Sequence, residues 1–280
     1  MAWGTYHFCN WQTAGFSITK IRSNFVAEPR WETPPLKERE MKNVKEILSQ
    51  SYSYLGKGAQ CYVFVSQDGG YVLKFLRISH LDAPAWLKRM PLPNFLEGWR
   101  NAKIALRKSK KEKDFASYLF AYEELQEETG LLFLHLNKSS DLKQEIQLID
   151  KTGIAHTLDL DQMEFILQKR AKPFYEAISE MIEDKKIENA ETAIRGLLEL
   201  LFTRRSHGLS DKDPDLETNF GLIGSRPVQF DIGRFKKGEL AKKNEPFRNE
   251  VIRITDRFKH WLQNKEPALA NYLDEQINAY

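Results

Sequence analysis

Residues 207–235 hold a concentration of oxygen-bearing side chains whose types suit metal-assisted chemistry. They are Asp211, Asp213, Asp215, Glu217, Asn219 and the Asp231 of an Asp-Ile-Gly tripeptide. Carboxylate and amide oxygens are hard ligands that suit Mg²⁺, and a carboxylate can also orient a hydroxyl group. We therefore expect this segment to form a site that holds a divalent metal and acts on a hydroxyl-bearing molecule.

The sequence around this segment predicts the packed elements that would position these side chains. A helix is expected over about 190–206, with apolar residues at helical spacing, and it leads directly into the acidic stretch. A hairpin is expected over 220–223 and 227–230, with its turn at Gly224-Ser225. Loops held at both ends by packed elements are the usual carriers of binding and catalytic residues.

A second candidate constellation lies earlier, where a glycine-rich turn and a lysine share a predicted meander of strands. Residues 54–65 contain strand-forming residues on both sides of Gly56 and Gly58. A further turn leads into a strand over 71–75 that carries Lys74. Glycines let backbone N–H groups approach phosphates closely, and a lysine on a nearby strand can place a positive charge beside them.

Taken in this order, the features resemble those of the protein-kinase-like superfamily. Residues 208–213 are similar to the family's Gly-x-x-His-Arg-Asp catalytic loop, with Asp211-Lys212 in place of His-Arg. The tripeptide at Asp231 is similar to Asp-Phe-Gly. The glycine turn and the lysine strand are similar to the Gly-rich loop and the Val-Ala-Ile-Lys strand, with Cys61 at the third glycine position. The resemblance covers about residues 55–235.

The resemblance implies an α+β, two-lobed protein-kinase-like fold with a mainly antiparallel-sheet N-lobe and a small helical C-lobe. It implies ATP and Mg²⁺ as cofactors. The nucleotide would be bound by Gly56, Gly58 and Lys74, and the metal by Asn219 and Asp231. Lys74 would contact the phosphates and so take part in catalysis.

The catalytic acid is left open among three aspartates. The family pattern has four residues between its catalytic Asp and its metal-binding Asn, whereas five residues separate Asp213 from Asn219. Asp213 matches the catalytic position and would orient the acceptor hydroxyl. An altered loop would give that role to Asp211 or Asp215.

Two further parts of a nucleotide site are implied by the resemblance. The family's lysine pairs with a glutamate on a helix, and here a predicted helix offers Glu123 at the edge of its apolar face. The predicted strand over 165–169 would lead into the hinge whose backbone receives the adenine. That hinge is expected at 168–171, with Gln168 and Arg170 as binding residues.

We expect three regions along the chain. Residues 1–50 form an N-terminal extension with a packing helix, residues 51–171 form the N-lobe with an insertion at about 78–111, and residues 172–280 form a shortened helical C-lobe. The C-terminal region shows a basic loop over 236–243 and two helices, each opened by a proline. It lacks the long activation segment and the Ala-Pro-Glu motif of protein kinases, so that family's peptide-docking platform is expected to be missing.

The expected insertion contains large apolar residues in a polar setting and ends in a basic run over 107–111. The apolar residues are Trp86, Leu87, Met90, Phe95, Leu96 and Trp99. Prolines break regular structure here, so a helix is predicted to begin only at Asp114. One interpretation is an ordered insertion packed on the small lobe with a solvated basic end. The other is a segment that docks a partner or a membrane surface.

Composition limits the class of protein further. The 280 residues are 41% hydrophobic and 29% charged with a net charge of +3, which is ordinary for a globular protein and too small to favour nucleic-acid binding. The two cysteines, Cys9 and Cys61, have no partner motif and indicate a reducing compartment. No stretch has the pattern of a secretory signal or the length of a membrane span, so we expect a cytoplasmic protein without a transmembrane segment.

Three functions are compatible with these residues. The first is an ATP-dependent phosphotransferase, an atypical kinase that transfers the γ-phosphoryl group to a hydroxyl of an unidentified protein or small molecule. The second is a pseudokinase-type binding protein or scaffold that acts through a partner, which the altered catalytic loop and the short C-terminal region favour. The third is AMP transfer on the same fold, for which a nucleotide bound in reversed orientation would be diagnostic.

Overall fold

The computed structural model describes residues 11–91, 93–211, 214–238 and 246–280. The chain has a mixed α+β fold of two compact units, as the sequence predicted. Unit 1 comprises Met1–Leu119 and Leu132–Gln168, and unit 2 comprises Phe120–Leu131 and Lys169–Tyr280. Each unit is therefore assembled from two separate stretches of the chain.

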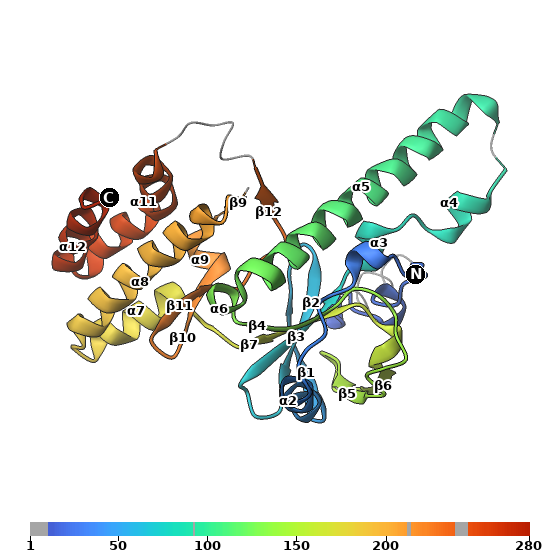
Figure 1. Ribbon diagram of the computed structural model, residues 1–280, viewed down its shortest axis with the longest axis horizontal. Coiled ribbons are helices and arrows are strands. Elements are labelled where there is room, and N and C mark those ends of the chain that lie inside the picture. The colour runs from blue at the N-terminus through green and yellow to red at the C-terminus, as the bar shows by residue number, and fades with distance from the viewer. Residues whose placement is uncertain (1–10, 92, 212–213, 239–245) are drawn as a thin grey trace. The chain divides into compact units, whose positions relative to one another are not determined.

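Unit 1 is organised around a sheet. Within the described residues the sheet has seven strands in the order β4-β7-β3-β2-β1-β5-β6 (Figure 1). The strands are β1 (Ser51–Lys57), β2 (Cys61–Ser66), β3 (Tyr71–Leu76), β4 (Leu131–His135), β5 (Glu145–Ile149), β6 (Ala155–Asp159) and β7 (Phe165–Lys169). The antiparallel meander of β1, β2 and β3 confirms the prediction, and β1 pairs in parallel with β5. Apolar residues at alternate positions, such as Leu73 and Phe75, are fully buried, which explains why these segments form strands.

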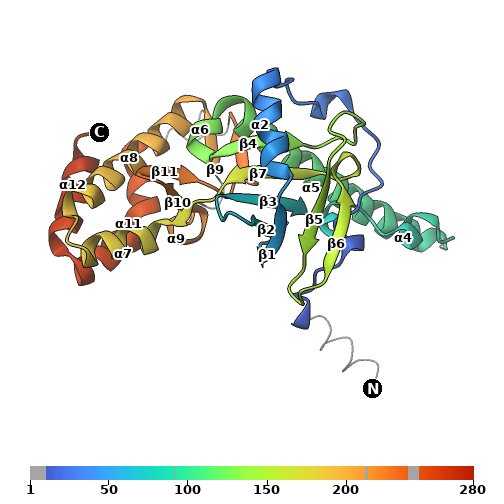
Figure 2. The ribbon, with the colours of Figure 1, turned by 90° about the horizontal axis from the view of Figure 1, so that it is seen from below.

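The N-terminal extension packs onto this sheet. Helix α2 (Glu38–Leu48) places its apolar side in the same apolar cluster as the strands (Figure 2). Two short 3-10 helices precede it, η1 (Ile18–Lys20) and η2 (Pro29–Trp31). Phe16 and Ile21 are buried in the same cluster, so these two residues of the extension contribute to the core of unit 1.

The segment between β3 and β4 is more helical than the sequence predicted. It contains α3 (Ile78–Leu81), α4 (Ala85–Arg89), α5 (Asn94–Glu124) and α6 (Gln126–Thr129). The prediction that a helix begins only at Asp114 is wrong, because α5 begins directly after Pro93. The Pro93 carbonyl accepts the N–H of Leu96 at 2.8 Å, so this proline starts a helix and does not break the whole segment. Gly130, with a φ of 65°, ends α6 in a conformation that glycine adopts without strain.

The interpretation of this segment as packed on the small lobe is wrong for most of its length. Among the described residues between Lys88 and Lys110, none is buried. At its basic end Lys108 is exposed, as predicted, whereas the last lysine, Lys111, is only 8% exposed. The Lys111 ammonium contacts the Glu28 carboxylate at 2.7 Å and lies 4.7 Å from the centre of the Phe25 ring. A lysine with a partner of opposite charge and an aromatic face can be buried at low cost.

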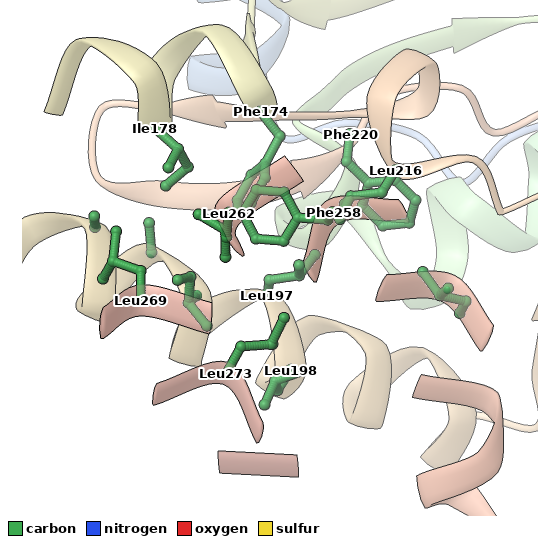
Figure 3. Packing of buried hydrophobic residues seen from close by; sticks show 14 of the residues in the cluster. Phe174, Ile178, Leu197, Leu198, Leu216, Phe220, Phe258, Leu262, Leu269 and Leu273 are labelled. Carbon is green, nitrogen blue, oxygen red and sulfur yellow. The ribbon is translucent and has the colours of Figure 1, made fainter. Parts of the chain in front are cut away.

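Unit 2 is built on helices that surround one apolar cluster. The helices are α7 (Phe174–Glu183), α8 (Ile187–Ser206), α9 (Leu216–Asn219), α11 (Phe247–Lys265) and α12 (Pro267–Asn278). Figure 3 shows side chains of these helices, among them Phe174, Leu197, Phe258 and Leu273, meeting one another and the side chain of Phe220, which follows α9. Each of these five residues is 0% exposed. Each long helix has apolar residues at helical spacing, and the face that they form lies against this cluster. The sequence pattern predicted these apolar faces.

Short strands connect these helices. They are β8 (Lys172–Pro173), β9 (Leu209–Asp211), β10 (Phe220–Ile223), β11 (Arg226–Gln229) and β12 (Phe235–Lys237). The β10–β11 hairpin confirms the prediction. The basic loop expected over 236–243 is wrong at its start, because Lys236 and Lys237 continue β12 and pair with β9. The buried ring of Phe235 anchors that strand, and residues 239–243 lie outside the described residues.

Candidate functional site

The β10–β11 hairpin of unit 2 brings Asn219 and Asp231 side by side. Phe220, the first residue of β10, pairs with Gln229, the last residue of β11. Asn219 lies just before this pair and Asp231 just after it. The Asn219 carbonyl accepts N–H bonds from Phe230 at 2.9 Å and from Asp231 at 3.4 Å. The backbone therefore holds the two predicted metal ligands next to each other.

Asp211 lies in the same part of unit 2. It pairs with Phe235 in the β9–β12 ladder. The Gln229 side-chain amide donates one hydrogen bond to the Asp211 carboxylate and another, at 3.5 Å, to the Asp231 carbonyl. One glutamine thus links Asp211 to the strand end that carries Asp231.

Gln229 and Asp211 belong to a buried polar network. Arg204 donates to the Gln229 Oε1 at 2.8 Å and to the Glu250 Oε1 at 2.9 Å, and Arg205 donates to the Glu250 Oε2 at 2.8 Å. Burial lowers the pKa of the Arg204 guanidinium, whereas the charges of Asp211 and Glu250 raise it. Arginine keeps its proton in proteins, so Asp211 and Glu250 lie near a buried positive charge.

The three candidate acids have different surroundings. Asp211 is held by Gln229, which is the geometry of a structural carboxylate. Asp215 precedes α9 and caps it, because its Oδ1 accepts the N–H of Glu217 at 2.9 Å. Asp213 lies outside the described residues. Two of the three aspartates therefore have a structural task in unit 2.

A pocket of about 260 Å³ lies beside the Asp215 turn. Its walls include Tyr175, Arg253 and Arg257. Burial, followed by the charges of Glu217 and Asp215, raises the pKa of Tyr175 to about 12, so its hydroxyl stays protonated. Asp215 and Asp256 also line the pocket, and the Arg257 guanidinium lies 3.8 Å from the Asp215 carboxylate. Donors and acceptors together suit a molecule that bears hydroxyl groups.

Unit 1 carries another set of predicted binding residues at the turn between β1 and β2. The Gly58 N–H donates to the Cys61 carbonyl at 2.9 Å and closes the turn. A side-chain carbon added at Gly56 or Gly58 would have no heavy atom within 4 Å. Packing therefore does not explain these glycines, and the backbone of the turn is open to a molecule from outside.

Cations surround this turn. Arg77 donates to the Gly58 carbonyl at 2.9 Å. Burial, followed by the charges of Lys57 and Arg77, lowers the pKa of Lys20. Cations that repel one another in this way would be stabilised by a bound anion.

The remaining predicted binding residues keep their expected places along the strands. Lys74 is half-buried on β3, opposite Val63 of β2. Gln168 is 0% exposed on β7, and Arg170 is exposed just beyond the end of that strand. These positions lie in or beside strands whose apolar pattern was plain in the sequence.

On α5, Glu124 has polar contacts in unit 2, whereas the sequence had favoured its neighbour Glu123 as the binding residue. Glu123 is exposed, whereas Glu124 accepts hydrogen bonds from His207 at 2.9 Å and from Lys237 at 3.4 Å. These two hydrogen bonds hold the pKa of Glu124 below its usual range. His207 is the C-cap residue of α8.

Sequence reasoning missed Arg204, Gln229 and Glu250. Arg204 lies seven residues after Leu197 and three after Leu201, so it continues the apolar face of α8. A charged residue on an apolar helical face is normally buried and paired. That spacing was the signal that could have revealed the network.

The donor set in unit 2 fits a metal that arrives with a nucleotide. Within the described residues, no group of three or more His, Cys, Asp or Glu side chains is arranged to hold a metal ion. Mg²⁺ is commonly bound by one or two protein groups together with waters and substrate phosphates. Asn219 and Asp231 could serve as such a pair, and other ligands would have to come from outside the protein.

No protein-family model and no curated protein matches this chain. Among solved structures, the chain is similar to WbdD, with 11% identity and a TM-score of 0.36 over 82% of this chain and 45% of that chain. It is also similar to Rv3197 from Mycobacterium tuberculosis, solved with erythromycin, with 14% identity and a TM-score of 0.33 over 81% of this chain and 58% of that chain. The chain spans about half the length of these two proteins, and similarity of this degree shows nothing about activity.

Proposed function

We propose that this protein is an ATP-dependent phosphotransferase of kinase-like fold that acts on a hydroxyl of a protein or a small molecule. The observation that carries the proposal is the Asn219–Asp231 pair, held by the N–H bond from Asp231 to the Asn219 carbonyl at 3.4 Å. A pair of oxygen ligands at one hairpin end suits a metal bound to phosphates. The open glycine turn with its surrounding cations supports a phosphate site in unit 1.

Each predicted residue has a role in this reaction. Gly56 and Gly58 offer backbone N–H groups to the phosphates, and Lys74 offers a positive charge. Asn219 and Asp231 would hold Mg²⁺, which would neutralise charge on the phosphates. Gln168 and Arg170 flank the backbone that receives the adenine.

The acceptor hydroxyl attacks the γ-phosphorus, so a bond forms between the acceptor oxygen and that phosphorus. The bond from the γ-phosphorus to the β–γ bridging oxygen breaks, and ADP leaves. We assign the acceptance of the hydroxyl proton to Asp213, because Asp211 and Asp215 have structural partners. We place the acceptor in the pocket beside the Asp215 turn, whose wall includes Pro214, the residue that follows Asp213 in the sequence.

Calorimetric titration with ATP, with and without Mg²⁺, tests the metal assignment. We expect binding that requires Mg²⁺ and that weakens at least about tenfold in Asp231→Asn. Asp184→Asn is the matched control, because Asp184 is exposed and pairs with Lys186 at 2.8 Å, and its binding should equal that of the wild type. Unchanged affinity in Asp231→Asn would remove the metal assignment.

The products distinguish the three functions. Phosphoryl transfer releases ADP, AMP transfer releases pyrophosphate, and a scaffold releases neither. The scaffold interpretation is favoured by one observation, the engagement of Asp211 in a buried network at the position where the family has histidine. Absence of ATP binding with and without Mg²⁺ would make it the better interpretation.

A further inference from the structure

The α4–α5 extension, defined here as residues 85–91 and 93–110, is a part of unit 1 without a core of its own. Figure 1 shows this half of α5 running away from the sheet of unit 1, with α4 at its outer end. The Arg100 guanidinium donates to the Met90 carbonyl at 3.2 Å and ties the end of α4 to α5. Buried positions resume on α5 only at Lys111.

An apolar stripe runs along this exposed helix. Phe95, Trp99, Ala102 and Leu106 have the spacing i, i+4, i+7 and i+11, so they share one side of α5. Phe95 is 81% exposed, Trp99 is 50% exposed and Leu106 is 65% exposed. Trp86 on α4 is 59% exposed and adds a second indole to the extension. Large apolar side chains gathered on one exposed element mark an interaction surface.

The extension and the residues that follow it on α5 carry an excess of positive charge. Residues 86–113 contain nine Lys or Arg and two Glu, a net charge of +7, whereas the whole chain has a net charge of +3. The rest of the chain is therefore net negative. Lys103, Arg107 and Lys110 follow one another along the flank of the apolar stripe, and residues 98–111 include no acidic residue.

We propose that the α4–α5 extension binds the surface of a lipid bilayer that contains anionic lipids. Phe95, Trp99 and Leu106 would enter the interfacial region, where amphipathic aromatic rings are favoured. Lys103, Arg107 and Lys110 would contact the anionic headgroups. Within the described residues no helix is long and apolar enough to cross a membrane, so the helix would lie on the surface.

The positive charge of the segment favours an anionic bilayer over a second copy of the chain as the partner of this surface. A dimer through this face would bring two segments of +7 together, which like-charge repulsion opposes. An anionic bilayer surface supplies negative charge, and it is wide enough to contact the whole exposed length of α5. The inference does not depend on the proposed phosphotransferase activity.

Vesicle flotation of the full-length protein tests the proposal. We expect binding to vesicles of equal parts phosphatidylcholine and phosphatidylserine, and none to phosphatidylcholine alone. The triple variant Lys103→Gln, Arg107→Gln, Lys110→Gln should bind about a hundredfold more weakly, because each of the three charges near an anionic surface contributes about fivefold. The triple variant Lys42→Gln, Arg195→Gln, Lys265→Gln removes the same charge from exposed positions elsewhere and should bind like the wild type.

A second triple variant, Phe95→Ser, Trp99→Ser, Leu106→Ser, tests the apolar stripe. These side chains are exposed, so the far-UV circular dichroism should not change, while vesicle binding should weaken at least about tenfold. Absence of binding to the anionic vesicles, or equal losses in the two charge variants, would overturn the proposal. Sedimentation that shows a dimer lost only in the apolar variant would instead assign this face to a second copy.

Discussion

Glu164 is a carboxyl group that unit 1 buries without completing its hydrogen bonds. It is 1% exposed, its Oε1 accepts the Ser23 hydroxyl at 2.5 Å, and its Oε2 has no partner among the described residues. Burial raises its pKa, although the Ser23 hydrogen bond and the charges of Lys138 and Lys111 oppose the change. A buried charge without full compensation is costly, so the folded protein favours the protonated form.

The titration of Glu164 should make the stability of the protein depend on pH. In the unfolded chain this group titrates near 4.5, and in the folded chain it titrates higher. Its contribution is therefore complete below about pH 4.5 and is lost as the pH rises through the folded pKa. Glu164→Gln lacks this titration, so urea denaturation should show the variant gaining stability relative to the wild type as the pH rises to neutrality. Glu145→Gln, on an exposed position of β5, should show no such trend, and identical trends in both variants would contradict the assignment.

At the scale of the element, the close approach of β10 to β8 depends on Gly221. Gly221 pairs with Pro173, and a side-chain carbon added there would collide with the Lys172 carbonyl oxygen and contact the Ala171 side chain. A backbone oxygen cannot rotate away as a flexible side chain would. One of the two strands would have to move, and with it the hairpin that carries Asn219.

Two glycine-to-alanine variants distinguish the steric effect at Gly221 from the general effect of replacing glycine by alanine. Gly221→Ala should lower the free energy of unfolding by about 1–3 kcal/mol, because the added carbon has no space. Gly98→Ala should raise it by about 0.5–1 kcal/mol, because Gly98 lies inside α5 with no heavy atom within 4 Å of the added carbon. Urea denaturation followed by circular dichroism measures both. A loss of stability in Gly98→Ala as large as that in Gly221→Ala would remove the steric explanation.

The elements that could be predicted from sequence are those with a regular apolar face. The β1–β3 meander, the β10–β11 hairpin and the helices of unit 2 have such faces, and the structure contains them. The first half of α5 was missed because the prolines just before it favour a break in regular structure. Strand β12 was missed because its two consecutive lysines are more typical of a loop. At the site, Asn219 and Asp231 were visible as residue types. Gln229 and Arg204 were not, because their partners are distant in sequence and only folding brings them together.

At the scale of the whole molecule, the proposed reaction needs residues from both units. Lys74 belongs to unit 1, and Asp231 belongs to unit 2. Each unit has its own apolar cluster. Neither set of predicted binding residues includes all the groups that phosphoryl transfer requires, so a shared nucleotide is the central requirement of the proposal.

A double-mutant cycle on Lys74 and Asp231 tests this requirement. If both residues act on one bound Mg-ATP, loss of the lysine charge changes the phosphates that share the metal, and the effects of Lys74→Met and Asp231→Asn on binding should couple by about 0.5–3 kcal/mol. Displacement of a fluorescent ATP analogue measures the affinities, including weak ones. Lys42→Met, at an exposed position of α2, should combine with Asp231→Asn without coupling. Effects of Lys74→Met and Asp231→Asn that add within about 0.3–0.5 kcal/mol would mean that the two residues do not share a nucleotide, and the roles assigned to them would then have to be separated.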